Sequence, residues 1–261
     1  MITFNNKDII LYNMENPKIS IITVSYNSEK TISKTIESVL RQTYSNFEYI
    51  IVDGKSKDNT ILVANNFRES FKDRGINYTI ISEPDNGIYD AMNKGIKKAS
   101  GDIVGIINSD DFYEDIALET VAKTFEKEQF DMFFADLRIL KKNGKSFIKK
   151  GKRDRFVSTR HWNHPTTFVT KSTYNDLGLF ILHSIYDDLD LYLRIRKAKK
   201  KIVIKNITLA NFVMGGVSNK KTFKEAMKRC KLKYWCYKNN GYCFIYWFEC
   251  FFMEVVKFFL T

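Results

Sequence analysis

An apolar run in the first half of the chain ends in two adjacent carboxylates. Residues 103–107 read Ile-Val-Gly-Ile-Ile, and Asn-Ser-Asp-Asp follows directly at 108–111. A buried strand that ends in this way places oxygen ligands at the carboxyl edge of a sheet, where open α/β sheets bind ligands. Because neighbouring acids repel each other, Asp110 and Asp111 favour a cation between them. Divalent cations such as Mg²⁺ bind through one or two carboxylates together with substrate phosphates, so the pattern indicates an enzyme that handles a diphosphate.

Polar residues also follow two earlier predicted strands. The strand at 19–25 ends at Tyr26-Asn27, and the strand at 47–52 ends at Asp53-Gly54. Each pattern alone is typical of a turn or a helix cap. Because the carboxyl ends of successive parallel strands lie at one edge of a sheet, we expect these residues to converge with Asp110.

A second acidic cluster lies at the start of a predicted helix in the second half of the chain. Asp187, Asp188 and Asp190 fall within four positions. One of them suffices to cap the helix, and three exceed what capping requires. A carboxylate across a cleft from a metal–diphosphate could take a proton from an attacking hydroxyl. Arg194 follows on the same helix, where it can pair with these acids.

Alternating strand and helix patterns predict the scaffold for these residues. In chain order the predicted elements are strand 19–25, helix 32–40, strand 47–52, helix 58–67, strand 78–81, helix 88–99, strand 103–107, helix 116–125, strand 131–139 and helix 187–198. Asn143-Gly144 predicts a hairpin-like turn. Repeated strand–helix units imply an α/β fold with a doubly wound, mostly parallel sheet. No G-x-G-x-x-G follows the first strand, which argues against a dinucleotide site.

The charge of the chain is strongly positive and unevenly distributed. The 261 residues carry a net charge of +12, with eleven Lys or Arg against one acid between Arg138 and Lys171. Such a patch attracts polyanions, which leaves nucleic acid, anionic lipid and phosphorylated substrates open, and a merely solvated surface is the structural alternative. The four cysteines lack paired spacing and no signal peptide is evident, so we expect a reducing, cytoplasmic setting.

The C-terminal tail is basic at first and then strongly aromatic. Glu249, Glu254 and Lys257 interrupt its aromatic part, so it is a poor membrane-spanning helix. On a helical wheel these charges share one side and leave a broad aromatic face, which is typical of an interfacial membrane anchor. Packing on the rest of the chain, or on a second subunit in a homodimer, is the alternative. A seven-residue spacing also predicts one packed helical face with three cysteines: Cys236, Cys243 and Cys250.

Five motifs in this order resemble those of glycosyltransferase family 2. They are Ile-Ser-Ile-Ile-Thr-Val-Ser-Tyr-Asn at 19–27, Ile-Val-Asp-Gly-Lys-Ser-Lys-Asp-Asn-Thr at 51–60, Ser-Glu-Pro-Asp-Asn-Gly-Ile-Tyr-Asp-Ala-Met-Asn-Lys-Gly at 82–95, Asn-Ser-Asp-Asp at 108–111 and Tyr-Asp-Asp-Leu-Asp-Leu-Tyr-Leu-Arg at 186–194. Within the family the chain is most similar to bacterial enzymes of O-antigen, capsule and exopolysaccharide assembly.

The resemblance implies a GT-A catalytic domain at 17–218, between an N-terminal extension at 1–16 and the helical tail at 219–261. It implies inverting transfer of a hexose or N-acetylhexosamine from a nucleotide-diphospho-sugar, with UDP as the expected nucleotide and Mn²⁺ or Mg²⁺ as cofactor. The implied acceptor is a saccharide on a polyprenyl diphosphate. The tail would then hold the enzyme at the inner face of the bacterial cytoplasmic membrane.

The resemblance also implies roles for single residues. By position, Asp188 is the catalytic base and Asp110, joined by Asp111, binds the metal. Asn108 stands where the family has the first acid of its D-x-D motif, and contact with ribose requires a hydrogen-bonding group rather than a charge. The other implied contacts are Tyr26, Asp53, Asn108 and Ser109 for the nucleotide, Asp85, Asp90 and Lys94 for the donor sugar, and His164 and Asp187 on the acceptor side.

Other interpretations of the same residues stay open at this point. Residues 83–94 also fit a turn followed by a capped helix, and a lone histidine such as His164 is often structural. A sugar nucleotidyltransferase also pairs acids with a metal, but it requires a Gly-rich phosphate loop that Val24-Ser-Tyr-Asn27 does not provide. A basic nucleic-acid-binding module would need aromatic residues among its Lys and Arg residues, and 138–155 has only Phe147. We therefore expect no nucleic-acid partner.

Overall fold

The computed structural model describes residues 16–154, 156–158, 160–214 and 222–260, without the side chains of 257–260. The expected N-terminal extension, apart from Asn16, and the start of the expected tail at 219–221 lie outside the described residues. In chain order the described elements are β1 (Ile19–Ser25), α2 (Ile32–Leu40), β2 (Phe47–Asp53), α3 (Thr60–Asn65), α4 (Arg68–Asp73), β3 (Asn77–Ser82), α5 (Ile88–Lys98), β4 (Ile103–Asn108), β5 (Phe112–Tyr113), α6 (Ala117–Glu128), β6 (Met132–Leu140), β7 (Ser146–Lys149), a 3₁₀ turn (His164–Thr166), β8 (Phe168–Thr170), α7 (Lys171–Leu177), α8 (Asp187–Lys197), β9 (Ile202–Val213), α9 (Phe223–Asn239) and α10 (Ile245–Leu260).

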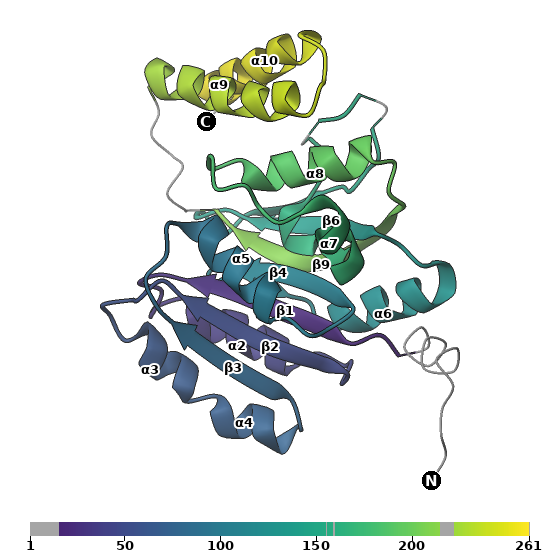
Figure 1. Cartoon of the computed structure of the whole chain (residues 1–261). Helices are drawn as coiled ribbons and strands as arrows, with labels where there is room; N and C mark the ends of the chain where they lie inside the picture. The colour runs from purple at the N-terminus through teal and green to yellow at the C-terminus, as the bar shows by residue number, and fades with distance from the viewer. Residues whose placement is uncertain (1–15, 155, 159, 215–221, 261) are drawn as a thin grey trace.

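The described strands form one sheet in the order β3-β2-β1-β4-β8-β6-β9-β5, with β7 paired to β6. The pairings of β1 with β2 and β4, of β2 with β3 and of β6 with β9 are parallel, while β5, β7 and β8 run against their neighbours. The arrows of β1, β2 and β3 therefore point to the same edge of the sheet (Figure 1). The predicted α/β class with a mostly parallel sheet is confirmed.

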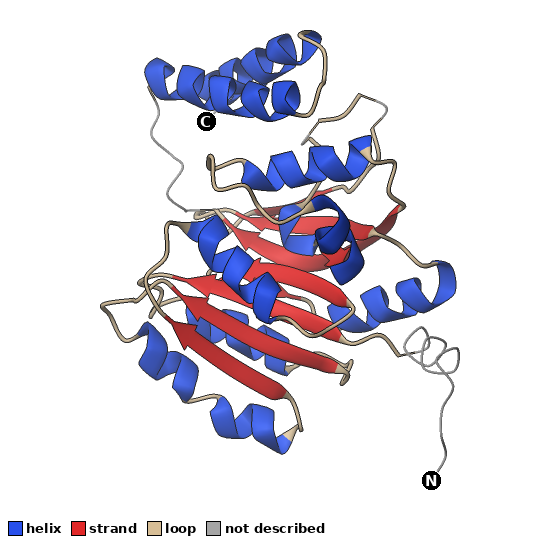
Figure 2. Cartoon of the chain, viewed as in Figure 1, coloured by secondary structure: helices blue, strands red, loops and turns tan. Residues whose placement is uncertain are grey.

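Helices cover both faces of the sheet (Figure 2) because the strands bury side chains on both faces. In β1, Ile19 and Ile21 belong to one core, with residues of α2, α4 and α6. Ile22 and Val24 point the other way, into a second core with residues of α5, α7, α8, α9 and α10. The alternation along the strand thus places α5 and α8 on the same face, which brings the donor-side motif at 82–95 next to the acidic motif at 186–194.

The order in which strands are added to the sheet reverses at β1. The order runs from β1 outwards to β2 and β3 on one side, and to β4 on the other. The crevice outside the carboxyl ends of the strands at such a switch point is where doubly wound proteins bind ligands. The loops after β1 and β4 lie at this switch point, and we call the region beside them the crevice.

The C-terminal tail forms two helices, and the prediction of one cysteine face is wrong. α9 ends at Asn239, Gly241 adopts a φ of 73°, and α10 begins at Ile245. Because the helix breaks here, Cys243 lies exposed in the turn, while Cys236 and Cys250 are buried. Both helices lie over α8 in Figure 1, and their buried residues belong to the same core as those of α8.

The charges of α10 do not share a solvent-facing side, which corrects the helical-wheel expectation. Glu254 is buried, accepts a 2.7 Å hydrogen bond from Arg229 Nε and also binds Lys233 Nζ. The aromatic residues of α10 differ in exposure: Tyr246 is buried, while Phe248 and Phe252 are exposed. Within the described residues no helix combines the length and the apolarity needed to cross a membrane.

Candidate active site

The loops after β1 and β4 meet at the switch point. Register pairing aligns Ser25 with Asp53, and Val24 with Asn108. Beyond the strand ends, Ser28 Oγ and Ser109 Oγ lie 2.8 Å apart. The sheet therefore brings the predicted nucleotide-binding residues of three strand ends to one edge, as expected from the parallel topology.

The Asp53 carboxylate is fully buried and holds this edge together. Ser25 Oγ donates to it over 3.0 Å, Ser56 N and Ser82 Oγ each over 2.8 Å, and Ser56 Oγ also donates. A buried carboxylate needs such donors because desolvation penalises its charge. Asp53 thus ties β1, β2 and β3 together and fixes the loop after β2. A contact with a nucleotide base would have to replace one of these donors.

Tyr26 is exposed at the same edge, with 58% of its surface accessible. Next to it, Asn27 has a φ of 50° and Lys55 in the facing loop a φ of 60°. Ser56 Oγ accepts from Asn27 N and Asn27 Oδ1 accepts from Lys57 N, so the two loops hold each other. Left-handed backbone in non-glycine residues persists only where its surroundings fix it, and it concentrates at binding sites.

The cluster at 108–111 contains polar atoms that lack partners. Asn108 Oδ1 and Asp111 Oδ2 are buried and have no hydrogen-bond partner among the described residues. Asp111 Oδ1 accepts from Val213 N over 3.1 Å. Burial, with the Asp110 carboxylate beside it, raises the pKa of Asp111 to about 8. Burial also raises the pKa of Asp110 above the ordinary value of a carboxyl group.

These atoms fit a divalent cation held jointly with a diphosphate. Within the described residues no group of three or more His, Cys, Asp or Glu side chains could hold a metal by itself. Mg²⁺ requires only one or two carboxylates when substrate phosphates complete its coordination. Asp110 and the unpartnered oxygen of Asp111 provide that number, and a cation beside them would restore the ionised form that burial disfavours.

The predicted donor-sugar residues surround the start of α5. Gly87 N donates to Asp85 Oδ1 and Asn86 N to Asp90 Oδ2, each over 2.9 Å. Lys94 Nζ lies 3.0 Å from Glu83 Oε1 and 3.8 Å from Asp90 Oδ2. These contacts are those of a turn followed by a capped helix, which is the structural alternative to a donor-sugar site. Asp85 nevertheless lies beside the loop after β2, since a Cβ added to Gly54 would lie 2.4 Å from Asp85 Oδ2.

Asp188 lies at the start of α8 and lines a narrow pocket. Ile106 of β4, His164 and Tyr192 line the same pocket. Ile106 lies two positions before the end of β4, the strand that precedes Asp110, so Asp188 lies over β4 on the face that α8 covers. Asp188 and the strand that precedes Asp110 therefore contribute to one pocket, and the convergence of Asp188 with Asp110 stays a prediction.

The acids that flank Asp188 have structural partners. Asp187 is fully buried and accepts 2.8 Å hydrogen bonds from His183 N and Ser184 N. The expected acceptor-side contact of Asp187 is therefore not available in this arrangement, and its carboxylate shapes the turn that precedes α8. Asp190 pairs with Arg194 Nε at 2.8 Å, so Arg194 pairs with one acid of the cluster as expected.

His164 lies in the pocket of Asp188, on the 3₁₀ turn. Burial lowers the pKa of His164, and the nearby Asp188 carboxylate partly opposes this effect. A neutral imidazole therefore prevails at neutral pH, which suits hydrogen bonding to a hydroxyl better than charge pairing with a phosphate. Its place beside Asp188 fits the expected acceptor side.

Two residues of α5 that sequence reasoning missed connect the donor side to Asp188. Tyr89 Oη donates to Ile185 O over 3.1 Å. Asn93 Nδ2 donates to Phe180 O, and Asn93 Oδ1 accepts from Phe180 N. Both residues lie within the motif at 82–95, but neither the motif nor helical periodicity indicates that they bind a segment 96 and 87 positions away, respectively.

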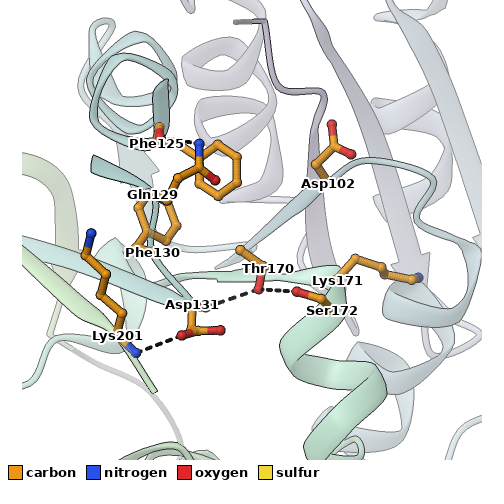
Figure 3. Close-up of a pocket in the computed structure, with 9 residues that line it drawn as sticks. All are labelled: Asp102, Phe125, Gln129, Phe130, Asp131, Thr170, Lys171, Ser172 and Lys201. Atoms are coloured by element: carbon orange, nitrogen blue, oxygen red, sulfur yellow. Dashed lines mark hydrogen bonds between the residues drawn. The ribbon is translucent and has the colours of Figure 1, made fainter. Parts of the chain in front are cut away.

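A second hollow lies at the opposite edge of the sheet (Figure 3). Asp102, Asp131 and Lys201 line it, at the amino ends of β4, β6 and β9. Lys201 N donates to Asp131 Oδ2, and Lys18 N donates to Asp102 Oδ2. The carboxylates of Asp102 and Asp131 already accept hydrogen bonds from backbone N–H groups, and the hollow lies at the edge opposite the switch point. It is therefore a weaker candidate for the active site than the crevice.

A sequence model of glycosyl transferase family 2 matches residues 20–184, which include the crevice loops and the pocket histidine. The chain belongs to glycosyl transferase family 2. The match supports neither the nucleotidyltransferase nor the nucleic-acid-binding alternative.

Two similar proteins are glycosyltransferases by name. A mycobacterial PGL/p-HBAD biosynthesis glycosyltransferase from Mycobacterium tuberculosis is 31% identical over 63% of this chain and 64% of its own length. The Escherichia coli enzyme WfgD, a UDP-Glc:alpha-D-GlcNAc-diphosphoundecaprenol beta-1,3-glucosyltransferase, is 33% identical over 50% of this chain and 49% of its own length. The chain thus matches less than two thirds of either relative.

Solved structures support the GT-A fold of this family-2 chain. S. aureus TarS 1-349 in complex with UDP has a TM-score of 0.60 and 21% identity, over 76% of this chain and 61% of that one. The mannosyltransferase PcManGT from Pyrobaculum calidifontis, in complex with GDP-Man and Mn²⁺, has a TM-score of 0.61 and 18% identity, over 83% and 61% of the two chains.

Asp53→Ala tests whether this carboxylate holds the crevice loops together. The change removes the buried acceptor of the donors from Ser25, Ser56 and Ser82, of which Ser25 is itself buried, and we expect a loss of about 3 kcal/mol in the free energy of unfolding. Urea titration measures it. Lys57→Ala, at an exposed position in the same loop, is the control and should change stability by less than about 0.5 kcal/mol. Equal stability of the two variants would contradict the role given to Asp53.

Proposed function

We propose that this protein is an inverting, metal-dependent glycosyltransferase that uses a nucleotide-diphospho-sugar, with UDP as the nucleotide, and a lipid-linked saccharide acceptor. The donated group is a hexose or N-acetylhexosamine. The names of WfgD and of the TarS–UDP complex support the class of donor. The diphosphoundecaprenol in the name of WfgD supports a polyprenyl-diphosphate acceptor in surface polysaccharide synthesis.

The observation that carries the proposal is the pocket that Asp188 and His164 share with Ile106 of β4, the strand that precedes Asp110 and Asp111. A single displacement with inversion requires the base on the face of the anomeric carbon opposite the departing diphosphate. Asp110 and Asp111 follow β4, and Asp188 of α8 lines a pocket with Ile106 of the same strand. A donor whose diphosphate lies at Asp110 would point its sugar toward the pocket of Asp188 and His164.

The side chains then have distinct tasks in the reaction. Asp188 accepts the proton of the acceptor hydroxyl as that oxygen bonds to the anomeric carbon, and the bond from this carbon to the diphosphate oxygen breaks. Because one displacement suffices, no covalent enzyme intermediate forms. The neutral imidazole of His164 can orient the acceptor hydroxyl. Tyr26 offers an exposed ring for the base of the nucleotide.

Asp110 and Asp111 would hold the divalent cation, with Mn²⁺ present in the PcManGT complex. A bound cation supplies positive charge that stabilises the departing diphosphate. Asn108 and Ser109, at the switch point, would contact the ribose or phosphates. Asn108 Oδ1 is free among the described residues to accept a ribose hydroxyl.

We further propose that the tail docks on the cytoplasmic-side membrane surface where such acceptors reside. α9 exposes a row of lysines, and α10 exposes apolar side chains on the face opposite its buried Cys250. Lysines beside exposed aromatic residues suit anionic headgroups and the acyl boundary, respectively. The exposed residues are Lys224, Lys228, Lys231 and Lys238 on α9, and Phe244, Ile245, Phe248 and Phe252 at α10.

Asp188→Asn tests the base. The amide keeps the shape of the side chain but cannot accept the proton, so we expect the turnover of a UDP-sugar with Mn²⁺ to fall about 100-fold or more. UDP affinity, measured by calorimetry, should stay within about twofold, since Asp188 contacts the acceptor rather than the nucleotide. Asp176→Asn, on the neighbouring helix α7, is the matched control. Unchanged turnover in Asp188→Asn would remove the base assignment.

Vesicle flotation tests the membrane surface. With vesicles that contain phosphatidylglycerol, we expect the wild type to float and Phe248→Ser/Phe252→Ser to remain in solution, because two aromatic anchors together contribute about 3 kcal/mol. Leu62→Ser, which replaces an exposed apolar residue on α3, should float like the wild type. If the wild type does not float but sediments as a dimer that the double variant dissociates, the face is a subunit interface instead.

A further inference from the structure

Residues 183–188, which we call the base turn, comprise the turn that leads into α8 and the first two residues of that helix. His183 and Ile185 are exposed, and Leu182 just before the turn has a φ of 57°. A leucine in left-handed backbone costs about 1–3 kcal/mol and persists only where neighbouring structure imposes it. The base turn therefore depends on contacts from outside its own sequence.

The tail helix α9 supplies contacts on one side of the base turn. The ring of Trp235 stacks on that of His183, with centroids 3.8 Å apart and an interplanar angle of 24°. Cys236 Sγ lies 3.4 Å from Tyr186 O, and Lys233 Nζ lies 5.1 Å from the centre of the Tyr186 ring. On the opposite side, Tyr89 of α5 binds Ile185 O.

α9 also holds the first turn of α8 itself. Asn240, buried at the end of α9, donates from Nδ2 to Asp190 Oδ1 over 2.7 Å. The other oxygen of Asp190 binds Arg194 Nε. The guanidinium of Arg194 in turn donates to the carbonyl oxygens of Gly178 and Leu179, which lead into the base turn. The tail is thus linked by hydrogen bonds to both ends of the segment that carries Asp188.

We propose that α9 is a positioning element of the active site, in which Trp235 acts through His183, and Asn240 through Asp190, to hold Asp188 in line with the acceptor hydroxyl. This inference rests on the proposed function of Asp188. It separates two tasks of the tail: α10 and the lysines of α9 meet the membrane, while the inner side of α9 sets the geometry of the base. Loss of Trp235 therefore impairs turnover even when no membrane is present.

A membrane-free assay of the full chain tests this role. The probe is release of UDP from the most reactive of UDP-glucose, UDP-galactose and their N-acetylated forms, with Mn²⁺. We expect Trp235→Ala and His183→Ala each to lower kcat about tenfold or more, since small displacements of a catalytic group are costly. KM for the donor and the affinity for UDP should stay within about twofold, and Trp235→Phe, which keeps a ring, should recover most of kcat.

Two comparisons make the test specific. Because Trp235 acts through His183, the double variant should lose no more kcat than either single variant. Asn240→Ala should lower kcat, whereas the exposed neighbour Asn239→Ala should match the wild type.

The outcomes separate the inference from the proposed function. Wild-type kcat in both Trp235→Ala and His183→Ala, or losses that multiply in the double variant, would overturn the positioning role and leave the glycosyltransferase proposal intact. Because His183 is exposed, His183→Ala keeps the test decisive even if Trp235→Ala unfolds. A wild type that releases no UDP from any of the donors would overturn the proposed function, and the inference with it.

Discussion

Burial of carboxylates at the ends of parallel strands is the constraint on which the site depends. A carboxylate in this position must be matched by donors or by a cation, because desolvation otherwise favours its neutral form. Asp53 is matched internally, by serines from three strand ends. Asp111 is matched only in part, and its raised pKa records the deficit. The fold thus satisfies one acid to build the crevice and leaves the other for a ligand.

In the acidic motif at 186–194, too, some carboxylates have partners within the protein and one lines a pocket. Asp187 and Asp190 are buried and bound to backbone, Arg194 and Asn240, and they fix the turn and helix on which Asp188 stands. Asp188 alone of the three reaches the pocket beside β4. Two of the three acids therefore have structural partners, which leaves Asp188 as the acid to which we assign the reaction. The tail contributes to this support through Asn240, and our proposals give it a positioning role as well as a membrane contact.

Local sequence patterns were enough to predict the strands and the helix beside the crevice. The β-branched runs at 19–25 and 103–107 and the helical spacing at 88–99 predicted β1, β4 and α5. A strand buried on both faces reads as a continuous apolar run, and a helix packed on one face leaves a helical period. β8 and β9 were missed, since a three-residue strand has no period and β9 begins within a lysine-rich stretch. The roles of Asp187 and Trp235 depend on partners distant in sequence, and no local pattern encodes such a pairing.

The central claim is that one crevice at the carboxyl edge holds the cation, the diphosphate and the base. Anomalous diffraction from crystals grown with UDP and Mn²⁺ tests it most directly. We predict a single strong manganese peak bound to Asp110 and to the diphosphate, with the pocket of Asp188 open toward the terminal phosphate. Manganese and UDP bound elsewhere, for instance in the hollow at the amino ends of the strands near Asp102 and Lys201, would contradict the account.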